Sequence, residues 1–158
     1  MAIITVGAGA ANYDSYSGSA YTYVDTGYGA SGTGIIDTIE LWYTVANGAG
    51  VKVGTWYFVS DVGGTKTYTN RDYEDIGSVT KDSKQTFTGL NCDVETDDVL
   101  GVYHTGGGLE HNSSGGEGGR LYALGNKFGG NIASSSFNNG IKMAMYGTGY
   151  TIQMLPPT

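Results

Sequence analysis

The sequence predicts an all-β protein, an antiparallel β-sandwich of the jelly-roll type. Apolar and polar residues alternate with a period of two along most of the chain, which is the pattern of half-buried antiparallel strands. Glycine occurs 28 times and is spread too evenly for a long helix. Turn-forming clusters separate the alternating segments at intervals of roughly 8 to 12 residues, as in sandwich folds. At 158 residues the chain has the length of one domain with a real core.

Each predicted strand is one alternating segment. The segments are residues 36–45, 51–59, 85–94, 98–104, 119–124 and 141–149. Residues 46–50 (ANGAG) and 61–66 (DVGGTK) are predicted to be hairpin turns, because glycine supplies the positive φ that tight turns need. Residues 95–98 (ETDD) have the aspartate-rich composition of a tight turn. The side chains predicted to be buried are Ile39, Leu41, Val53, Leu90, Val102, Met143 and Met145.

The N-terminal residues differ in composition from the rest. Residues 1–32 are rich in Gly, Ser, Ala and Tyr, so we predict an N-terminal arm or edge strand there and the sandwich over 33–158. The chain starts with the apolar, β-prone stretch MAIITV, and we expect it to act as an assembly strand. Its apolar side chains are Ile3, Ile4 and Val6. Such a strand either closes the sheet of its own subunit or adds to the open edge of a neighbour, and the glycine-rich tether favours the second position.

Charge and composition exclude several classes of protein. Only 15 % of the residues are charged and the net charge is −7, so we expect no nucleic-acid partner. No segment has the length of a membrane span and the start lacks the features of a signal peptide, so we expect synthesis in the cytosol and no membrane partner. Cys92 is the single cysteine, which rules out an intrachain disulfide, and its alternation with Leu90 and Val94 predicts a small buried side chain.

Both histidines lie in the glycine-rich segment 101–122. One glutamate lies between them and a second glutamate follows them. The four are His104, Glu110, His111 and Glu117. Neighbours on a strand point to opposite faces, and a flexible Ser/Gly spacer positions an acid/base pair poorly, so neither a metal site nor a glycosidase is favoured. We predict a contact loop at one end of the sandwich, whose four side chains do not converge and can be replaced by alanine without loss of the fold. No metal and no cofactor is predicted.

Aromatic and acidic clusters are the remaining candidates. Trp42, Trp56 and Phe58 form a flat platform for a sugar ring, an intersubunit contact, or the second sheet-face of a buried core, and burial in the core or at an interface is favoured. Two acidic clusters, one at 72–75 and one at 93–98, supply oxygen atoms that suit calcium, but neither matches an EF-hand loop. Turn capping by the aspartates is the favoured interpretation.

Four segments recur in an order that is more specific than any one motif. They are GTGIIDTIELWY, then GVKVGTWYFVSDVGGTKTYTNRD, then IGSVTKDSKQTFTGLNCDVETDDVLGVYHTGGGLE, then IKMAMYGTGYT. This order resembles the jelly-roll domains of phage and virus virion proteins (decoration, appendage and tail proteins) and is also similar to secreted carbohydrate-binding modules. The resemblance covers roughly residues 33 to 149 and rests on strand order and turn chemistry, so it bears on fold more than on function.

The resemblance and the composition together imply a non-enzymatic virion structural protein. It would be a capsid decoration or appendage subunit that acts as a homo-oligomer and contacts other virion proteins, on a virion or extracellular surface. The alternative is a carbohydrate-binding module or lectin, with or without calcium, whose partner is a glycan.

Overall fold

The computed structural model describes residues 1–152, and these residues form strands, turns and no helix. The strands are β1 (Ile3–Val6), β2 (Ser15–Ser17), β3 (Tyr21–Asp25), β4 (Gly34–Val62), β5 (Thr65–Val79), β6 (Lys84–Phe87), β7 (Cys92–Val94), β8 (Val99–Tyr103), β9 (Gly106–Asn112), β10 (Gly119–Leu124), β11 (Asn131–Ser134), β12 (Phe137–Asn139), β13 (Lys142–Met143) and β14 (Met145–Thr151). Neighbouring strands pair antiparallel throughout. The prediction of an all-β antiparallel sandwich is confirmed.

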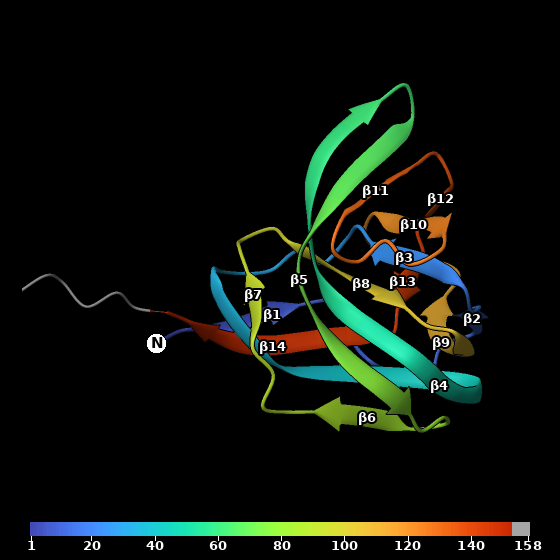
Figure 1. The fold of residues 1–158 in the computed structure, drawn as a ribbon, viewed down its shortest axis with the longest axis horizontal. Coiled ribbons are helices and arrows are strands. Elements are labelled where there is room, and N and C mark those ends of the chain that lie inside the picture. The colour runs from blue at the N-terminus through green and yellow to red at the C-terminus, as the bar shows by residue number, and fades with distance from the viewer. Residues whose placement is uncertain (153–158) are drawn as a thin grey trace, which may run out of the picture.

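The long strand β4 connects the two layers of the sandwich (Figure 1). Its first part pairs with β14 on one side and with β6 and β7 on the other, and β1 completes this layer beyond β14. Its last part pairs with β5 and β8 in the second layer, which continues through β3 and β10. The middle of β4 pairs with β9, which also pairs with β2 and β13.

The predicted hairpin turn at residues 46–50 is wrong. The chain bends there and continues as β4, because two different partners hold the two sides of the bend: Ala49 pairs with Gly106 of β9, and Gly48 pairs with Val79 of β5. Gly50, at φ +58°, supplies the local freedom. The turn at 61–66 is confirmed, with Gly63 and Gly64 both at positive φ between β4 and β5.

The main core lies between the two layers. Six of the seven predicted core side chains are almost fully buried, and Leu90 is partly buried against them. Cys92 is buried in the same core, as predicted, and burial raises the pKa of its thiol to about 12.

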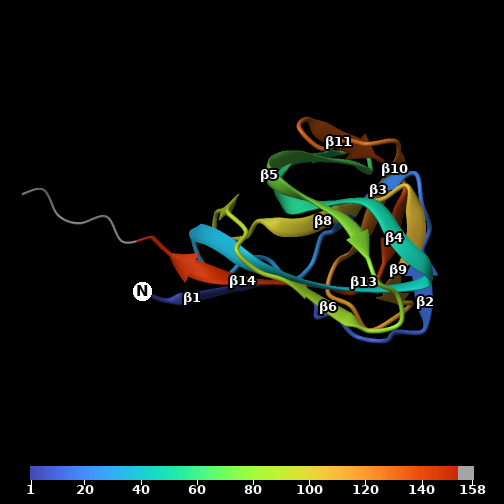
Figure 2. The same cartoon turned by 60° about the horizontal axis from the view of Figure 1, so that its bottom comes forward.

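A second, smaller core lies within the curl of the second layer (Figure 2). β11 and β12 follow one another in the chain yet pair with opposite edges of this layer, β5 and β10, so the layer folds over itself. The side chains enclosed are Val24, Trp56, Tyr68, Val99, Leu121 and Ile132, with Phe128 and Phe137 packed against them.

The N-terminal strand pairs within its own chain, which is one of the two alternatives left open by the sequence. β1 pairs with β14, and Ile4 and Val6 are buried in the main core, while Ile3 is 78 % exposed. The outer edge of β1 is partly occupied, because Ser31 donates its backbone N–H to the Thr5 carbonyl (3.1 Å) and accepts the Thr5 N–H on its hydroxyl (3.0 Å). A division of the chain at residue 32 does not follow a boundary of the fold, since β3 lies between β8 and β10.

Candidate functional site

The segment predicted to be a contact loop is mostly strand. Residues 101–112 lie in β8 and β9 or in the short connection between them, and 119–122 lie in β10, which leaves only 113–118 as a loop. His104, Glu110 and His111 are buried, and only Glu117 is exposed. The prediction is wrong for three of the four residues because the glycines allow close packing here: the Tyr16 ring covers Gly108, 2.5 Å from where a Cβ would stand.

His104 follows β8 and lies inside the sandwich with both ring nitrogens in hydrogen bonds. Nε2 donates to the carbonyl oxygen of Ser17 (3.2 Å), since a carbonyl can only accept, so the neutral ring carries its proton on Nε2. Nδ1 then accepts the hydroxyl of Tyr43 (2.9 Å). Burial lowers the pKa of His104 to about 4 and raises that of Tyr43 well above its usual value, so both groups are neutral at pH 7.

His111 lies on β9 and meets the same serine from another side. Its Nδ1 stands 2.9 Å from the Ser17 hydroxyl and 3.3 Å from Nη1 of Arg120 on β10, which itself donates to the Ser17 hydroxyl (2.8 Å). Burial and the adjacent guanidinium lower the pKa of His111 to about 4. The prediction that the two histidines do not converge is therefore wrong, because they meet at Ser17.

Arg120 is a partly buried cation without a carboxylate partner in residues 1–152. Its guanidinium carbon lies 5.2 Å from the ring centres of both Tyr23 and Tyr122, and Nη2 donates to the side-chain oxygen of Asn138 (2.7 Å). Its Nε is buried and makes no hydrogen bond within the described chain. We call Ser17, Tyr43, His104, His111 and Arg120 the polar cluster.

Asp25 is a buried carboxyl group on β3, directly opposite Arg120 of β10. Its two oxygens accept backbone N–H groups, Oδ2 from Met143 (3.0 Å) and Oδ1 from Gly27 (3.2 Å). Burial nevertheless raises the pKa of Asp25 to about 7. Burial therefore favours the protonated form of this carboxyl group well above the pH range of an ordinary aspartate.

Ser17 and His111 form a hydroxyl–imidazole pair like that of a nucleophile and its base. Ser17 is almost fully buried, and Arg120 donates to the oxygen that would have to attack a substrate. This arrangement ties β2, β9 and β10 together, and its contacts are those of a structural network. Sequence reasoning missed Ser17, Tyr43 and Arg120 as members, because three separate strands contribute them.

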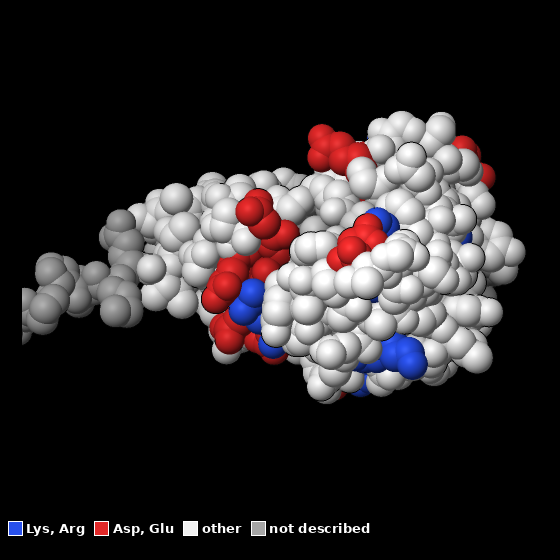
Figure 3. All heavy atoms as spheres, turned by 90° about the horizontal axis from the view of Figure 1, so that it is seen from above, with Lys and Arg blue, Asp and Glu red and all other residues white. Residues whose placement is uncertain are grey.

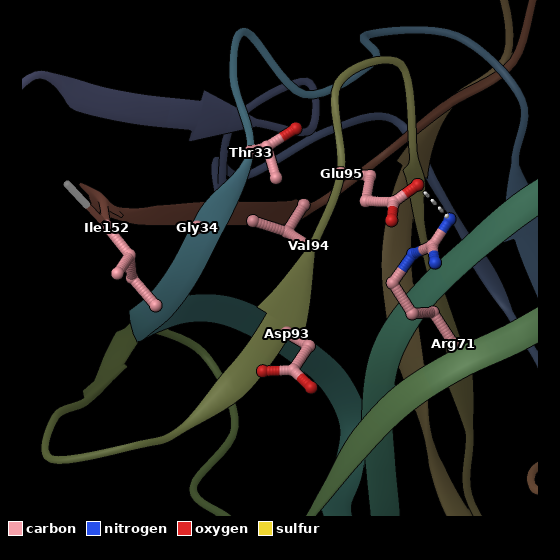
Figure 4. A pocket seen from close by; sticks show the side chains of 7 residues that line it. All are labelled: Thr33, Gly34, Arg71, Asp93, Val94, Glu95 and Ile152. Atoms are coloured by element: carbon pink, nitrogen blue, oxygen red, sulfur yellow. Dashed lines mark ion pairs between the residues drawn. The ribbon is translucent and has the colours of Figure 1, made fainter. Parts of the chain in front are cut away.

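A surface pocket lies elsewhere, beside the start of β4 and the end of β7 (Figure 4). It has a volume of about 260 Å³ and is lined by Thr33, Gly34, Arg71, Asp93, Val94, Glu95 and Ile152. Arg71 points along its wall but is neutralised, because it forms ion pairs with the buried Asp98 and with Glu95 (3.1 Å). The predicted tight turn at 95–98 is confirmed here by a hydrogen bond from the Asp98 N–H to the Glu95 carbonyl (3.0 Å).

The two acidic clusters gather on one side of the molecule around the basic groups of Arg71 and Lys52 (Figure 3). They cap backbone groups, as predicted: Asp72 accepts the N–H of Asp93 (2.8 Å), and Glu74 accepts that of Asn91 (2.9 Å). Within residues 1–152 no group of three His, Cys, Asp or Glu side chains is placed to hold a metal ion. In the same part of the chain no helix is long and apolar enough to cross a membrane.

The three residues of the candidate sugar platform do not share a surface. Trp56 is fully buried in the second core, edge-on to Phe128, so the alternative of core burial is the correct one for this residue. Trp42 is half-buried on the first part of β4. Phe58 is 56 % exposed near the tip of the β4–β5 hairpin. A flat aromatic platform made of these three residues is excluded.

The β4–β5 hairpin carries several exposed apolar side chains. It rises beyond the rest of the sandwich (Figure 1), and Phe58, Val59 and Val62 are 56 %, 51 % and 73 % exposed. The only charged side chains close to its tip, Asp61 and Lys66, form an ion pair with each other (2.8 Å). We call Phe58, Val59 and Val62 the hairpin patch.

Comparisons of the chain with models of protein families, with curated proteins and with solved structures find no match.

Proposed function

We propose that the protein is a non-enzymatic structural subunit that assembles with copies of itself, as capsid decoration or appendage subunits of virions do. The observation that carries the proposal is the hairpin patch, three exposed apolar side chains on a projecting, electrically neutral hairpin. Exposed apolar patches on soluble domains are typical of interaction sites. Elsewhere the molecule is acidic, with a net charge of −7.

The charge distribution favours a second copy as the partner at this patch. Two acidic subunits repel each other over most of their surfaces. At the hairpin the ion pair of Asp61 and Lys66 cancels the local charge, so copies can meet there without a like-charge penalty. The virion setting and the jelly-roll assignment rest on the strand order that resembles virion proteins. A glycan-binding module is a weaker alternative, because its platform loses Trp56 to the core.

The oligomeric state tests the proposal. We expect the purified chain to form oligomers in sedimentation velocity at concentrations of tens of micromolar, and the double variant Val59→Asp with Val62→Asp to sediment as a monomer. Both valines are more than half exposed, so the substitutions should leave the fold intact.

Leu124→Asp is the matched control, since Leu124 is also exposed but lies at the end of β10, away from the hairpin. This variant should assemble like the unmodified chain. A chain that stays monomeric at every concentration, or a double variant that assembles normally, would contradict the proposed function.

A further inference from the structure

The strand β2 has three residues, and Ser17 is the one whose side chain is buried; beside it Asp14 accepts two hydrogen bonds from Ser113, and the Tyr16 ring covers Gly108. Within the described residues β2 pairs only with β9, over the three positions from Ser15 to Ser17. The Ser17 side chain contacts His111 and Arg120, and its carbonyl oxygen accepts from His104. Between the end of β1 at Val6 and the start of β3 at Tyr21, β2 is the only strand. Release of β2 therefore needs the loss of the contacts at Ser17 and of the three-residue pairing with β9, and it leaves the pairing of the other strands intact.

The charged group closest to His111 is positive. Arg120 on β10 places Nη1 3.3 Å from Nδ1 of His111, while Lys142 on β13 neighbours the Met143 that pairs with His111 and therefore points to the opposite face of that strand. Asp14 precedes β2 and attracts the imidazolium, but it is exposed and already accepts two hydrogen bonds from Ser113. Glu110 is the neighbour on β9 and points to the opposite face of the strand.

The groups that face His104 offer no negative charge. The Tyr43 hydroxyl binds Nδ1, and the ring of Tyr23 is stacked on the imidazole, 6.2 Å between centres. Asp25 on β3 carries a buried carboxyl group opposite Arg120, and burial raises its pKa to about 7. At pH 5 Asp25 is therefore protonated and cannot balance a positive charge on either ring.

We propose that acidic pH releases β2 and the adjoining residues 12–18 from the sandwich, because His111 becomes protonated, while the two layers stay folded. A protonated His111 carries a hydrogen on Nδ1, so the Ser17 hydroxyl must turn and accept from both His111 and Arg120. Protonation also places a second positive charge beside Arg120, in a site with little water. Releasing β2 opens the site to solvent, which screens the repulsion between the two charges.

The direction of the pH effect follows from proton linkage. With β2 in place the pKa of His111 is about 4, and with β2 released it returns toward the ordinary value of about 6.5. The closed state is thus favoured above pH 6.5, and this preference is lost as the pH falls toward 4. For one histidine the ratio of released to closed molecules rises roughly 70-fold between pH 7.5 and 4.5. The inference does not depend on the assembly function proposed above.

The first layer lacks such a trigger. β1, β14 and the first part of β4 bury Ile4, Val6, Ile36, Ile39 and Met145, none of which titrates. These strands should keep their hydrogen bonds under the conditions that release β2.

Amide hydrogen exchange followed by NMR tests the proposal on the full chain. Protection factors, which correct for the intrinsic pH dependence of exchange, are measured at pH 7.5, 6.0 and 4.5 for β2 and for residues 36–41 of β4. We expect protection of β2 to fall by tens-fold or more and that of 36–41 to change by less than about threefold. Constant protection of β2, or an equal loss in both regions, would contradict local release.

The variant His111→Gln identifies the residue that responds to pH. Glutamine can accept the Ser17 hydroxyl but does not titrate, so most of the pH dependence of β2 protection should disappear. Asn138→Ala is the control: it removes a hydrogen bond of Arg120 and should lower protection by the same factor at every pH. A pH dependence that persists in His111→Gln would overturn the role of His111. Should this variant fail to fold, the comparison of β2 with β4 in the unmodified chain decides.

Discussion

The two ends of the space between the layers are filled by different kinds of side chain. β1 and β14 lie toward one end of the molecule, and β2 and β9 lie toward the other (Figure 1). The side chains buried near β1 and β14 are aliphatic, and the polar cluster lies near β2 and β9. Both ends are buried and well connected. Aliphatic packing keeps its value at any pH, whereas a buried polar network is favourable only while every donor meets an acceptor in the right protonation state. The sandwich therefore has one end whose stability is constant and one whose stability depends on conditions.

Truncation at the aliphatic end should have the largest effect. Ile36 is fully buried between β14 and β7, and Ile36→Ala removes three carbon atoms from a packed core. We expect a loss of about 2 to 5 kcal/mol in the free energy of unfolding, measured by denaturant titration. The loss should be equal at pH 7.5 and 5.0. A loss that changes with pH would show that the aliphatic end is coupled to the titrating groups.

Removal of the central hydroxyl at the polar end should have the next largest effect. Ser17→Ala leaves the imidazole of His111 and one donor of Arg120 without their partner in a buried site. The expected cost is about 1 to 3 kcal/mol in the same denaturant titration at pH 7.5. Ser19→Ala, at an exposed position two residues later, is the control and should cost less than about 0.5 kcal/mol. Equal effects of the two substitutions would mean that the polar cluster contributes nothing to stability.

The buried Asp25 should oppose the histidines in the pH dependence of stability. Its pKa of about 7 in the folded chain lies above the value near 4 of an unfolded aspartate, so its contribution is complete below pH 4 and is lost as the pH rises to 7. Both histidines have the opposite sign, because their pKa values are lowered: their contribution is complete above pH 6.5 and is lost toward pH 4.

Asp25→Asn should therefore steepen the loss of stability on acidification between pH 6.5 and 4. The change in slope is expected to be at most about 1.4 kcal/mol per pH unit, seen in denaturant titrations at four or five pH values. The slope is the informative quantity, since the substitution also alters a hydrogen bond to Met143 or Gly27 at every pH. An unchanged slope would show that Asp25 is ionised in the folded chain.

A substitution in the bend of β4, between the two ends, should have the smallest effect, and it should raise the free energy of unfolding instead of lowering it. Val45 has φ +71°, an unfavourable conformation for a β-branched residue, and its side chain is 59 % exposed. Val45→Gly relieves this strain but increases the freedom of the unfolded chain, so we expect a net gain of up to about 1 kcal/mol. A clear loss of stability in the thermal melting curve would mean that Val45 makes a contact that fixes the bend.

The alternation of apolar residues predicted the buried face of the first part of β4 and of β8, because side-chain direction along a strand is a local property. It failed over 56–59, where Trp56 is buried in the second core and Tyr57 and Val59 are exposed. The same parity also applied to the histidines: His104 stands two residues after the core residue Val102, and His111 two residues after the buried Leu109. The glycine content of the segment obscured this signal, since glycine marks close strand packing as well as loops.

The partners of each strand could not be predicted from the sequence. The segment ANGAG is a bend instead of a turn because two distant strands pair with its two sides. Gly106 of β9 pairs with Ala49, and Val79 of β5 pairs with Gly48. The meeting of Ser17 with both histidines and Arg120 likewise depends on three strands that are distant in the chain. Pairing over such separations is set by the whole fold.

The protonation of the two histidines in the folded chain is the most direct test of the contrast between the two ends. The imidazole signals of protein labelled with ¹³C and ¹⁵N at histidine can be followed by NMR from pH 8 to the onset of unfolding. We predict that both rings stay neutral through pH 5.5, with pKa values of about 4, and that His104 carries its proton on Nε2. Two ordinary titrations with pKa values near 6.5 would contradict a buried polar end and the acid release of β2 with it.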